Sequence, residues 1–196
     1  MDTIETKMND AFRTTFLLPR EKVVTDFLTD VLSSLYQFRS DDQNIEVISL
    51  YYYAPQPLSF LFAMPNYEYY NPDKTTQIAE LQLKDHVLED YTYFDVQTVC
   101  RKVLDENNID FSAYLNQDNL LDLANYWENQ LGLEIDFLQK CWMNAKDNTR
   151  SKTIGFLESS DHSAGVTDLD NGFELPFEIE IDEYLKSRGF LIKKEI

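Results

Sequence analysis

Hydrophobic residues in the first part of the chain recur every three or four positions, which is the period of a helix that buries one apolar stripe. Between residues 19 and 38 this stripe is unbroken, and Pro19 suits a first helical turn because its missing N–H would have no partner there. A spacing of four residues predicts a shorter leading helix, with apolar positions at Ile4, Met8, Phe12 and Phe16. We therefore expect residues 1 to about 40 to be helical.

The pattern changes at residue 45. Residues 45–53 and 58–64 are rich in β-branched and aromatic side chains, which are typical of strands. Residues 54–57 contain two prolines, and a proline cannot donate a backbone hydrogen bond to a sheet. The sequence therefore predicts a hairpin over residues 45–64. Because apolar residues fall on both faces of these strands, we expect helices to cover the hairpin.

Residues 73–147 are predicted to be mainly helical. The first helix starts at Asp73 and extends to about residue 89, although the apolar alternation at residues 78–83 leaves a strand open. Asp95 is expected to cap the next helix. Gly132 is expected to separate the last two helices, because glycine commonly ends a helix. These two helices are placed at residues 117–131 and 134–147.

The C-terminal part, residues 153–196, is predicted to be rich in strands and turns. Residues 153–158 favour a strand, and the pair Asn171-Gly172 favours a tight turn between two strands. Asp182 is expected to cap a last short helix that ends at Gly189. Together these elements predict one α+β domain over residues 1–196, in which the antiparallel hairpin and the C-terminal strands pack with several helices.

Charge adds information about possible partners. The chain of 196 residues has 35 Asp and Glu against 17 Lys and Arg, a net charge of −18, and an aromatic share of 14% that argues against disorder. Residues 103–139 contain eight acids and residues 153–185 contain nine, and neither stretch has a single Lys or Arg. Such a charge repels nucleic acid and anionic membranes, and it favours a basic protein partner or a metal ion.

One crowded group of four acids and a histidine is a candidate metal site for a metal-dependent or carboxylate-based hydrolase. Crowded carboxylates attract divalent cations. The members of this group lie close together in the sequence and are Glu158, Asp161, His162, Asp168 and Asp170. A calcium loop starting at Asp168 would need glycine at position 6 and Glu at position 12. Gly172 falls at position 5 and Ile179 at position 12, so the turn at Asn171-Gly172 is the better interpretation.

Signatures of catalysis are otherwise missing from the sequence. Asp161, His162 and Ser163 are adjacent in the chain, whereas the members of a catalytic triad converge from separate segments. No glycine-rich phosphate loop, Cys-x-x-Cys pair or His-Glu-x-x-His helix occurs. We therefore favour a noncatalytic protein over an enzyme, and we expect no cofactor.

The leading hypothesis is a noncatalytic acidic binding protein, such as an immunity protein that neutralises a basic, nuclease-type toxin. A nuclease binds a polyanion, so its active site is basic and attracts an acidic inhibitor. Loop tyrosines beside acids and a dense run of C-terminal acids are the candidate partner-binding residues: Tyr67, Tyr69, Tyr70, Glu178, Glu180, Asp182 and Glu183. A subunit of a larger assembly is a further alternative, and self-assembly is left open.

The remaining features indicate where such a protein would work. Cys100 and Cys141 lie on the apolar sides of expected helices, which favours reduced, buried thiols. The first residues lack the layout of a secretory signal, and the longest apolar stretch is too short to span a bilayer. We expect a cytoplasmic protein that binds neither membranes nor nucleic acid.

Overall fold

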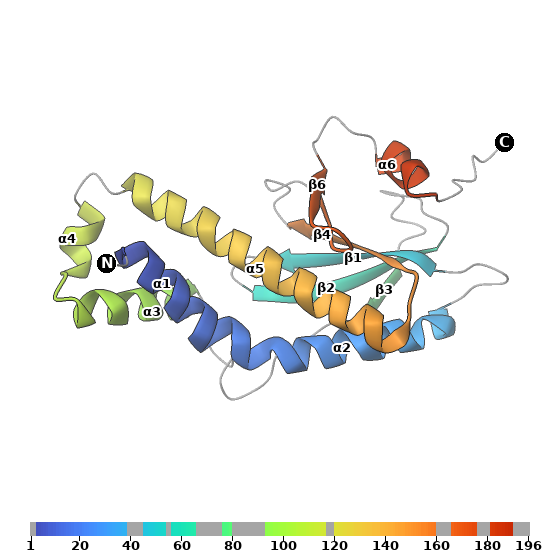
Figure 1. The fold of residues 1–196 in the computed structure, drawn as a ribbon, viewed down its shortest axis with the longest axis horizontal. Coiled ribbons are helices and arrows are strands. Elements are labelled where there is room, and N and C mark those ends of the chain that lie inside the picture. The colour runs from blue at the N-terminus through green and yellow to red at the C-terminus, as the bar shows by residue number, and fades with distance from the viewer. Residues whose placement is uncertain are drawn as a thin grey trace. The chain divides into compact units, whose positions relative to one another are not determined.

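The computed structural model describes residues 3–38, 45–53, 56–65, 76–79, 93–116, 120–159, 166–175 and 181–189 (Figure 1). Its contacts divide the chain into two compact units, one of Met1–Val24 with Leu83–Leu138 and the other of Thr25–Gln82 with Gln139–Ile196. Helices combine with a mixed sheet, so the predicted α+β class is confirmed. A single domain over residues 1–196 stays a prediction.

The N-terminal part of the chain is helical, as its apolar period predicts. The Thr3 hydroxyl accepts a hydrogen bond from the Thr6 N–H at 3.1 Å and so caps the first helix. A π-helical turn and a 3-10 turn that contains Pro19 then lead into the second helix. The successive elements are α1 (Ile4–Phe12), η1 (Arg13–Leu17), η2 (Leu18–Arg20), α2 (Glu21–Ser34) and η3 (Leu35–Phe38).

The first unit contains α1 together with α3 (Tyr93–Glu106) and α4 (Phe111–Asn116). Helices α1 and α3 pack against each other, and the first unit's core includes the buried side chains of Met8, Phe12, Cys100, Val103 and Leu104. Helix α3 starts two residues before Asp95, so the prediction that Asp95 caps it is wrong. Asp110 caps α4 instead, because its Oδ1 accepts from the Ala113 N–H at 2.7 Å.

Helix α5 (Leu120–Thr149) runs for 30 residues through Gly132. The prediction of two helices separated at this glycine is therefore wrong. An interior glycine costs a helix only about 1 kcal/mol, which strong helix formers on both sides can offset. The buried stripe predicted for the second of these helices is confirmed at Leu138, Cys141, Trp142 and Ala145. Cys100 and Cys141 are both buried, as expected.

The second unit contains a sheet in the order β3-β2-β1-β4-β5-β6. Its strands are β1 (Ile45–Tyr53), β2 (Gln56–Pro65), β3 (Thr76–Ala79), β4 (Ile154–Ser159), β5 (Val166–Asp168) and β6 (Phe173–Leu175). Strands β1 and β2 form the predicted antiparallel hairpin, β1 pairs with β4 in parallel, and all other pairs are antiparallel. Residues 76–79 form strand β3, so the helix predicted from Asp73 is wrong at these residues. Their backbone hydrogen bonds pair with β2, and the apolar alternation at residues 78–83 had left a strand open.

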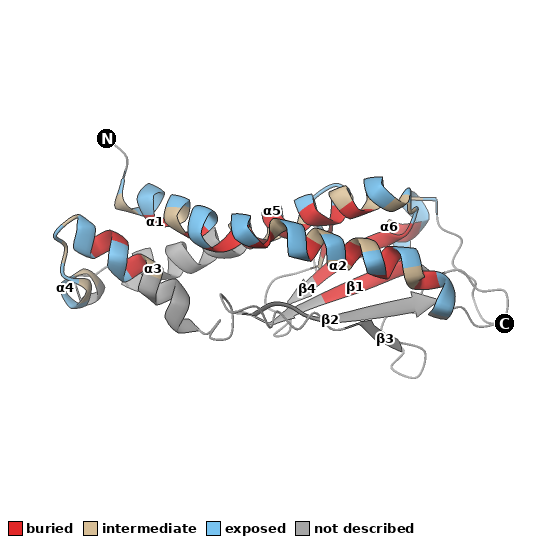
Figure 2. Cartoon of the chain, turned by 90° about the horizontal axis from the view of Figure 1, so that it is seen from below, coloured by how far each residue is buried: buried red, intermediate tan, exposed pale blue. Residues whose placement is uncertain are grey.

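Helices cover both faces of β4, which Figure 2 shows as buried along most of its length. Ile154 and Phe156 belong to a buried cluster with Leu185 of α6 (Ile181–Ser187). Gly155 points to the opposite face, because successive side chains of a strand alternate. There it lies against the indole of Trp142 in α5.

Helix α6 starts before Asp182, so Asp182 is not its cap, whereas Gly189 follows the helix with φ at +88° and ends it as predicted. None of the helices in the described part of the chain combines the length and apolar character needed to cross a bilayer.

Candidate functional site

The turn that joins β5 to β6 positions two carboxylates. Gly172 has φ at +72°, a backbone conformation that favours glycine, and its N–H donates to the Asp168 carbonyl at 2.8 Å. The Asp168 Oδ1 accepts from the Asp170 N–H at 2.7 Å, which tightens the turn. The Leu169 N–H donates to the Gly155 carbonyl at 2.9 Å and so fixes the turn to β4. The turn predicted at Asn171-Gly172 is confirmed.

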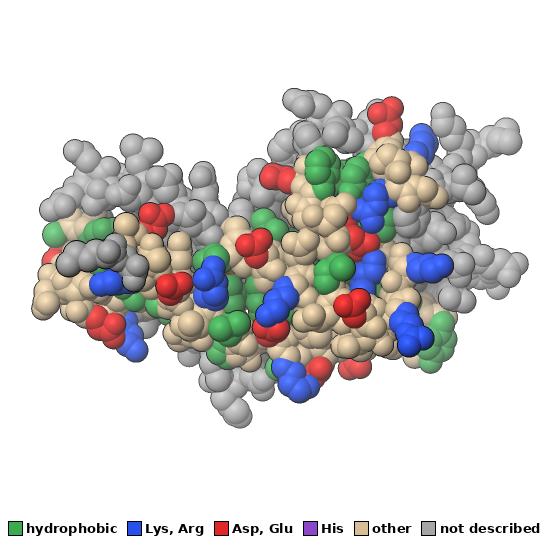
Figure 3. Space-filling model, viewed as in Figure 1, with side chains coloured by type: hydrophobic (Ala, Val, Ile, Leu, Met, Phe, Trp, Pro, Cys, Tyr) green, Lys and Arg blue, Asp and Glu red, His purple; other side chains and the backbone are tan. Residues whose placement is uncertain are grey.

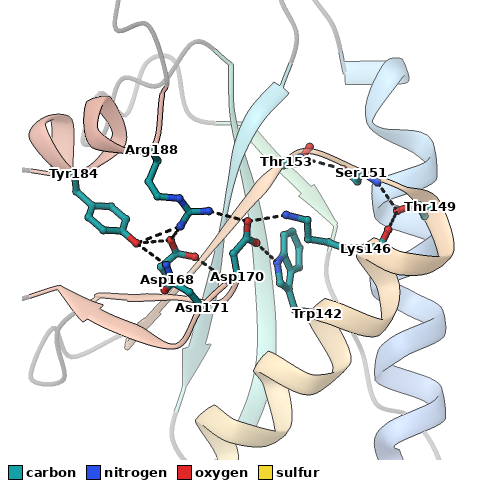
Figure 4. Close-up of polar contacts among 10 residues, drawn as sticks. All are labelled: Trp142, Lys146, Thr149, Ser151, Thr153, Asp168, Asp170, Asn171, Tyr184 and Arg188. Carbon is teal, nitrogen blue, oxygen red and sulfur yellow. Dashed lines mark hydrogen bonds and ion pairs between the residues drawn. The ribbon is translucent and has the colours of Figure 1, made fainter.

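Asp168 has a fully buried side chain, so its charge needs partners. Its Oδ2 accepts hydrogen bonds from the Tyr184 hydroxyl at 2.6 Å and from Nη1 of Arg188. Both partners come from the C-terminal end of the chain, one helical turn apart (Figure 4). Asp168 therefore ties α6 and the residue that follows it to the β5–β6 turn.

Asp170 faces the other helix. Its Oδ1 accepts from Nε1 of Trp142 at 2.7 Å, and its Oδ2 accepts from Nζ of Lys146 at 2.7 Å. Nη2 of Arg188 also reaches Oδ2, at 3.2 Å. The turn thus connects α5 with α6 through one continuous polar network (Figure 4). We refer to this network as the carboxylate clasp, made of Trp142, Lys146, Asp168, Asp170, Tyr184 and Arg188.

The clasp is electrically balanced, because two carboxylates meet one ammonium and one guanidinium. Burial raises the pKa of Tyr184, and its hydrogen bond to Asp168 raises this pKa further. Burial alone would lower the pKa of Arg188, but the hydrogen bond to Tyr184 and the charges of Asp168 and Asp170 raise it. The clasp therefore keeps its tyrosine protonated and its arginine charged, which suits a structural role and not proton transfer near neutral pH.

A shallow hollow of about 630 Å³ lies beside the clasp. Phe173 is the most exposed hydrophobic residue of its lining at 44%, and its ring stacks on that of Tyr184 with centroids 5.6 Å apart and planes 10° apart. The residues that line the hollow are Asn171, Phe173, Glu183, Tyr184, Ser187 and Arg188. The hollow is open to solvent, and the exposed ring of Phe173 forms part of its surface.

The predicted metal-site residues are only partly brought together. Asp168 and Asp170 meet in the clasp, where basic and hydrogen-bonding side chains occupy their oxygens. Glu158 lies in β4, but its side chain is outside the described residues, as are Asp161 and His162. Within the described ranges, no three His, Cys, Asp or Glu side chains are placed to hold a metal ion. The metal site at residues 158–170 stays a prediction.

Of the predicted partner-binding residues, Glu183 is exposed and lines the hollow. Asp182 lies in α6, but its side chain is outside the described residues. The remaining predicted residues also lie outside the described ranges: Tyr67, Tyr69, Tyr70, Glu178 and Glu180.

Sequence reasoning missed the partners of the two carboxylates and the exposed Phe173. A signal for the partners existed, because Trp142 and Lys146, like Tyr184 and Arg188, are spaced four residues apart and so share one face of a helix. Comparison of the chain with protein-family models, with curated proteins and with solved structures finds no match.

Proposed function

We propose that the chain is a noncatalytic binding protein whose acidic surface engages a basic protein partner. Residues 83–138 contain 12 Asp and Glu against 3 Lys and Arg, and so carry half of the net charge of −18. Four of the described acids in this segment are exposed, whereas Glu134 is buried. The exposed acids are Asp105, Glu106, Asp110 and Asp136.

The C-terminal end of α3 is the observation that carries the proposal. Asp105 and Glu106 lie in its last turn, which has no basic residue. The free carbonyl groups of a helix end already carry partial negative charge, so each acid there costs about 0.3–1 kcal/mol. Lys7 donates a hydrogen bond to Oδ1 of the neighbouring Asn107, which places one cation beside two acids. A basic partner would remove the remaining repulsion on binding.

The distribution of charge favours steering over a single contact patch. On the face seen in Figure 3, Lys and Arg side chains are interspersed with Asp and Glu, and neither sign forms a continuous area. Long-range attraction depends on the summed charge and does not need such an area. Attraction of this kind raises association rates by about 10- to 1,000-fold at low salt.

An inhibitor of a nuclease-type toxin is the form of this function that fits the charge best. The active site of a nuclease must be basic to hold a polyanionic substrate, so an acidic inhibitor competes for the same positive surface. Such an inhibitor needs no catalytic residues of its own. The clasp would give it a fixed shape at the β5–β6 turn, since charged groups with internal partners are held in one geometry.

Affinity capture from the lysate of the source organism tests the proposal. The bait is the unmodified chain, and the double variant Asp105→Asn/Glu106→Gln is compared with Asp30→Asn/Asp147→Asn, which removes two exposed acids elsewhere. We expect one basic protein that is retained at low salt, weakened at high salt, and captured less well by the first variant than by the second. The captured protein should degrade nucleic acid and lose that activity on addition of the chain. Capture of many unrelated basic proteins, equally by all three baits, would contradict the proposal.

The same variant makes a prediction about stability that needs no partner. Removing the acids at the end of α3 should raise the free energy of unfolding by about 0.3–1 kcal/mol for each residue at low ionic strength. Asp136→Asn is the matched control, because it removes an exposed acid from the interior of α5 and should change stability by less than about 0.5 kcal/mol. Urea denaturation at low and high salt measures both effects, and a loss of stability in the double variant would show that these acids have favourable internal roles.

A further inference from the structure

We infer that the hollow beside α6 binds an arginine side chain of the partner. The inference rests on the proposed function and deepens it, because it names one group on the partner and the residues that receive that group. The hollow offers an aromatic surface and a free carboxylate. These are the two features that a guanidinium recognises, by stacking and by charge-assisted hydrogen bonds.

The aromatic surface is exposed and held in place. Phe173 is 44% exposed, and its ring stacks on Tyr184. The Tyr184 hydroxyl donates to Asp168 at 2.6 Å and accepts from Nδ2 of Asn171 at 3.1 Å. Because these hydrogen bonds hold the Tyr184 ring in place beneath Phe173, little side-chain freedom is lost when a ligand binds to the pair. A guanidinium on such an aromatic surface gains about 0.5–1 kcal/mol at an exposed site.

The charge around the hollow also favours a cation. Arg188 lines the hollow, but its positive charge is matched by Asp168 and Asp170 in the clasp. Glu183 is exposed and takes part in none of the ion pairs found among the described residues. The unmatched charge of the lining is therefore negative, which complements arginine and opposes an anionic ligand.

The polar groups of the lining leave little for a neutral polar ligand. The Ser187 hydroxyl donates to the Tyr184 carbonyl at 2.6 Å. Asn171 uses both ends of its amide, since Nδ2 donates to Tyr184 and Oδ1 accepts from the Phe173 N–H at 2.8 Å. Glu183 is then the charged acceptor of the lining, and it takes part in none of the ion pairs found among the described residues. A ligand that only donates, and that also stacks, fits this set best.

Titration with N-acetyl-arginine-N-methylamide tests the inference on the whole chain. Two-dimensional amide NMR follows each backbone N–H, and N-acetyl-citrulline-N-methylamide is the control, because citrulline has almost the same shape without the charge. We expect the arginine probe to shift the amides of Phe173, Glu183 and Tyr184 with one common dissociation constant. Phe173→Ala should weaken binding about 2- to 5-fold, and Glu183→Gln should weaken it about 1.5- to 5-fold. Both side chains are exposed, so the spectra of the variants should otherwise match that of the unmodified chain.

Two results would overturn the inference. One is an equal response to the arginine and citrulline probes. The other is a set of amide shifts that is spread over exposed acids, such as Asp105 and Asp136, and that does not change in Phe173→Ala. Because the probe replaces the partner, this test is independent of lysate capture. Probe binding without a captured partner would sustain the arginine site and contradict the proposed function. A captured partner with no probe binding would sustain the proposed function and contradict the arginine site.

Discussion

Replacing Asp170 by asparagine is the most direct test of the carboxylate clasp. The carboxylate has donors on both sides, with Nε1 of Trp142 on Oδ1 and Nζ of Lys146 on Oδ2, each at 2.7 Å. An asparagine amide has one accepting end and one donating end. In either orientation, its NH₂ group therefore faces another donor. The substitution keeps the shape of the side chain and removes one charge and at least one hydrogen bond.

The size of the effect follows from burial. Side chains of Asp170 and Lys146 are 12% and 14% exposed, so an unpaired ammonium regains little water. Breaking a buried ion pair by removing one partner costs about 3–5 kcal/mol, and a hydrogen bond to a charged group contributes about 1.5–3 kcal/mol. Arg188 is 28% exposed and keeps its contact with Asp168, which reduces the penalty. We expect Asp170→Asn to lower the free energy of unfolding by about 2–3 kcal/mol.

Urea denaturation of the variant and of Glu174→Gln measures this loss. Glu174 is exposed on the neighbouring strand, so its replacement removes the same charge and should change stability by less than about 0.5 kcal/mol. The double variant Asp170→Asn/Lys146→Met should be more stable, by at least about 0.5 kcal/mol, than the sum of the two single losses predicts. The reason is that it no longer contains an ammonium without a partner. If Asp170→Asn costs no more than Glu174→Gln, the clasp contributes no net stability and the reasoning is refuted.

Three further predictions concern two glycines, the pKa of Tyr184 and the binding of divalent cations. Gly155→Ala should lower the free energy of unfolding by about 1–3 kcal/mol, because a Cβ there would lie 2.6 Å from the buried indole of Trp142. Gly132→Ala should raise it by about 1 kcal/mol, because a Cβ there would have nothing within 4 Å and alanine favours a helix over glycine. Thermal unfolding compares the two variants. The raised pKa of Tyr184 means that folding favours its protonated form, so its contribution is complete below pH 10.0 and is lost as the pH rises through the raised value. Denaturation curves at alkaline pH should show this loss in the unmodified chain and a smaller one in Tyr184→Phe. Mg²⁺, Mn²⁺, Ca²⁺ or Zn²⁺ should leave the melting temperature unchanged, and a stabilisation near 2.7 kcal/mol at 100 times the dissociation constant would instead support the metal site at residues 158–170.

Local patterns in the sequence were sufficient for most of the elements. The apolar period predicted the first two helices, and the β-branched runs predicted the hairpin, because each signal lies within one element. Errors arose where a neighbouring strand or the flanking residues outweigh the local signal. At residues 76–79 pairing with β2 stabilises a strand, and at Gly132 the helix formers on both sides outweigh the preference of one glycine to end a helix.

The site was less predictable, because its contacts join distant positions. Crowding of Asp168 and Asp170 could be expected from the sequence, and the spacing of four between Tyr184 and Arg188 marked a shared helix face. Nothing local indicated that these two pairs would meet, since the pairing depends on how α6 packs beside the β5–β6 turn. The exposed position of Phe173 depends on the same packing, because an aromatic residue in a strand is ordinarily expected in a core.

The clasp also changes the meaning of the two base-free stretches. Residues 153–185 contain no Lys or Arg, yet Lys146 before the stretch and Arg188 after it fold back onto Asp170. Two acids of this stretch are therefore neutralised within the fold. The described acids of residues 103–139 are mostly exposed, and the salt dependence of partner association should accordingly follow this stretch more than the β5–β6 turn. Under the proposed function, the linear charge pattern accounts for the long-range attraction of a partner. The proposed arginine site depends instead on the acid that the fold leaves without a basic partner, which among the residues lining the hollow is Glu183.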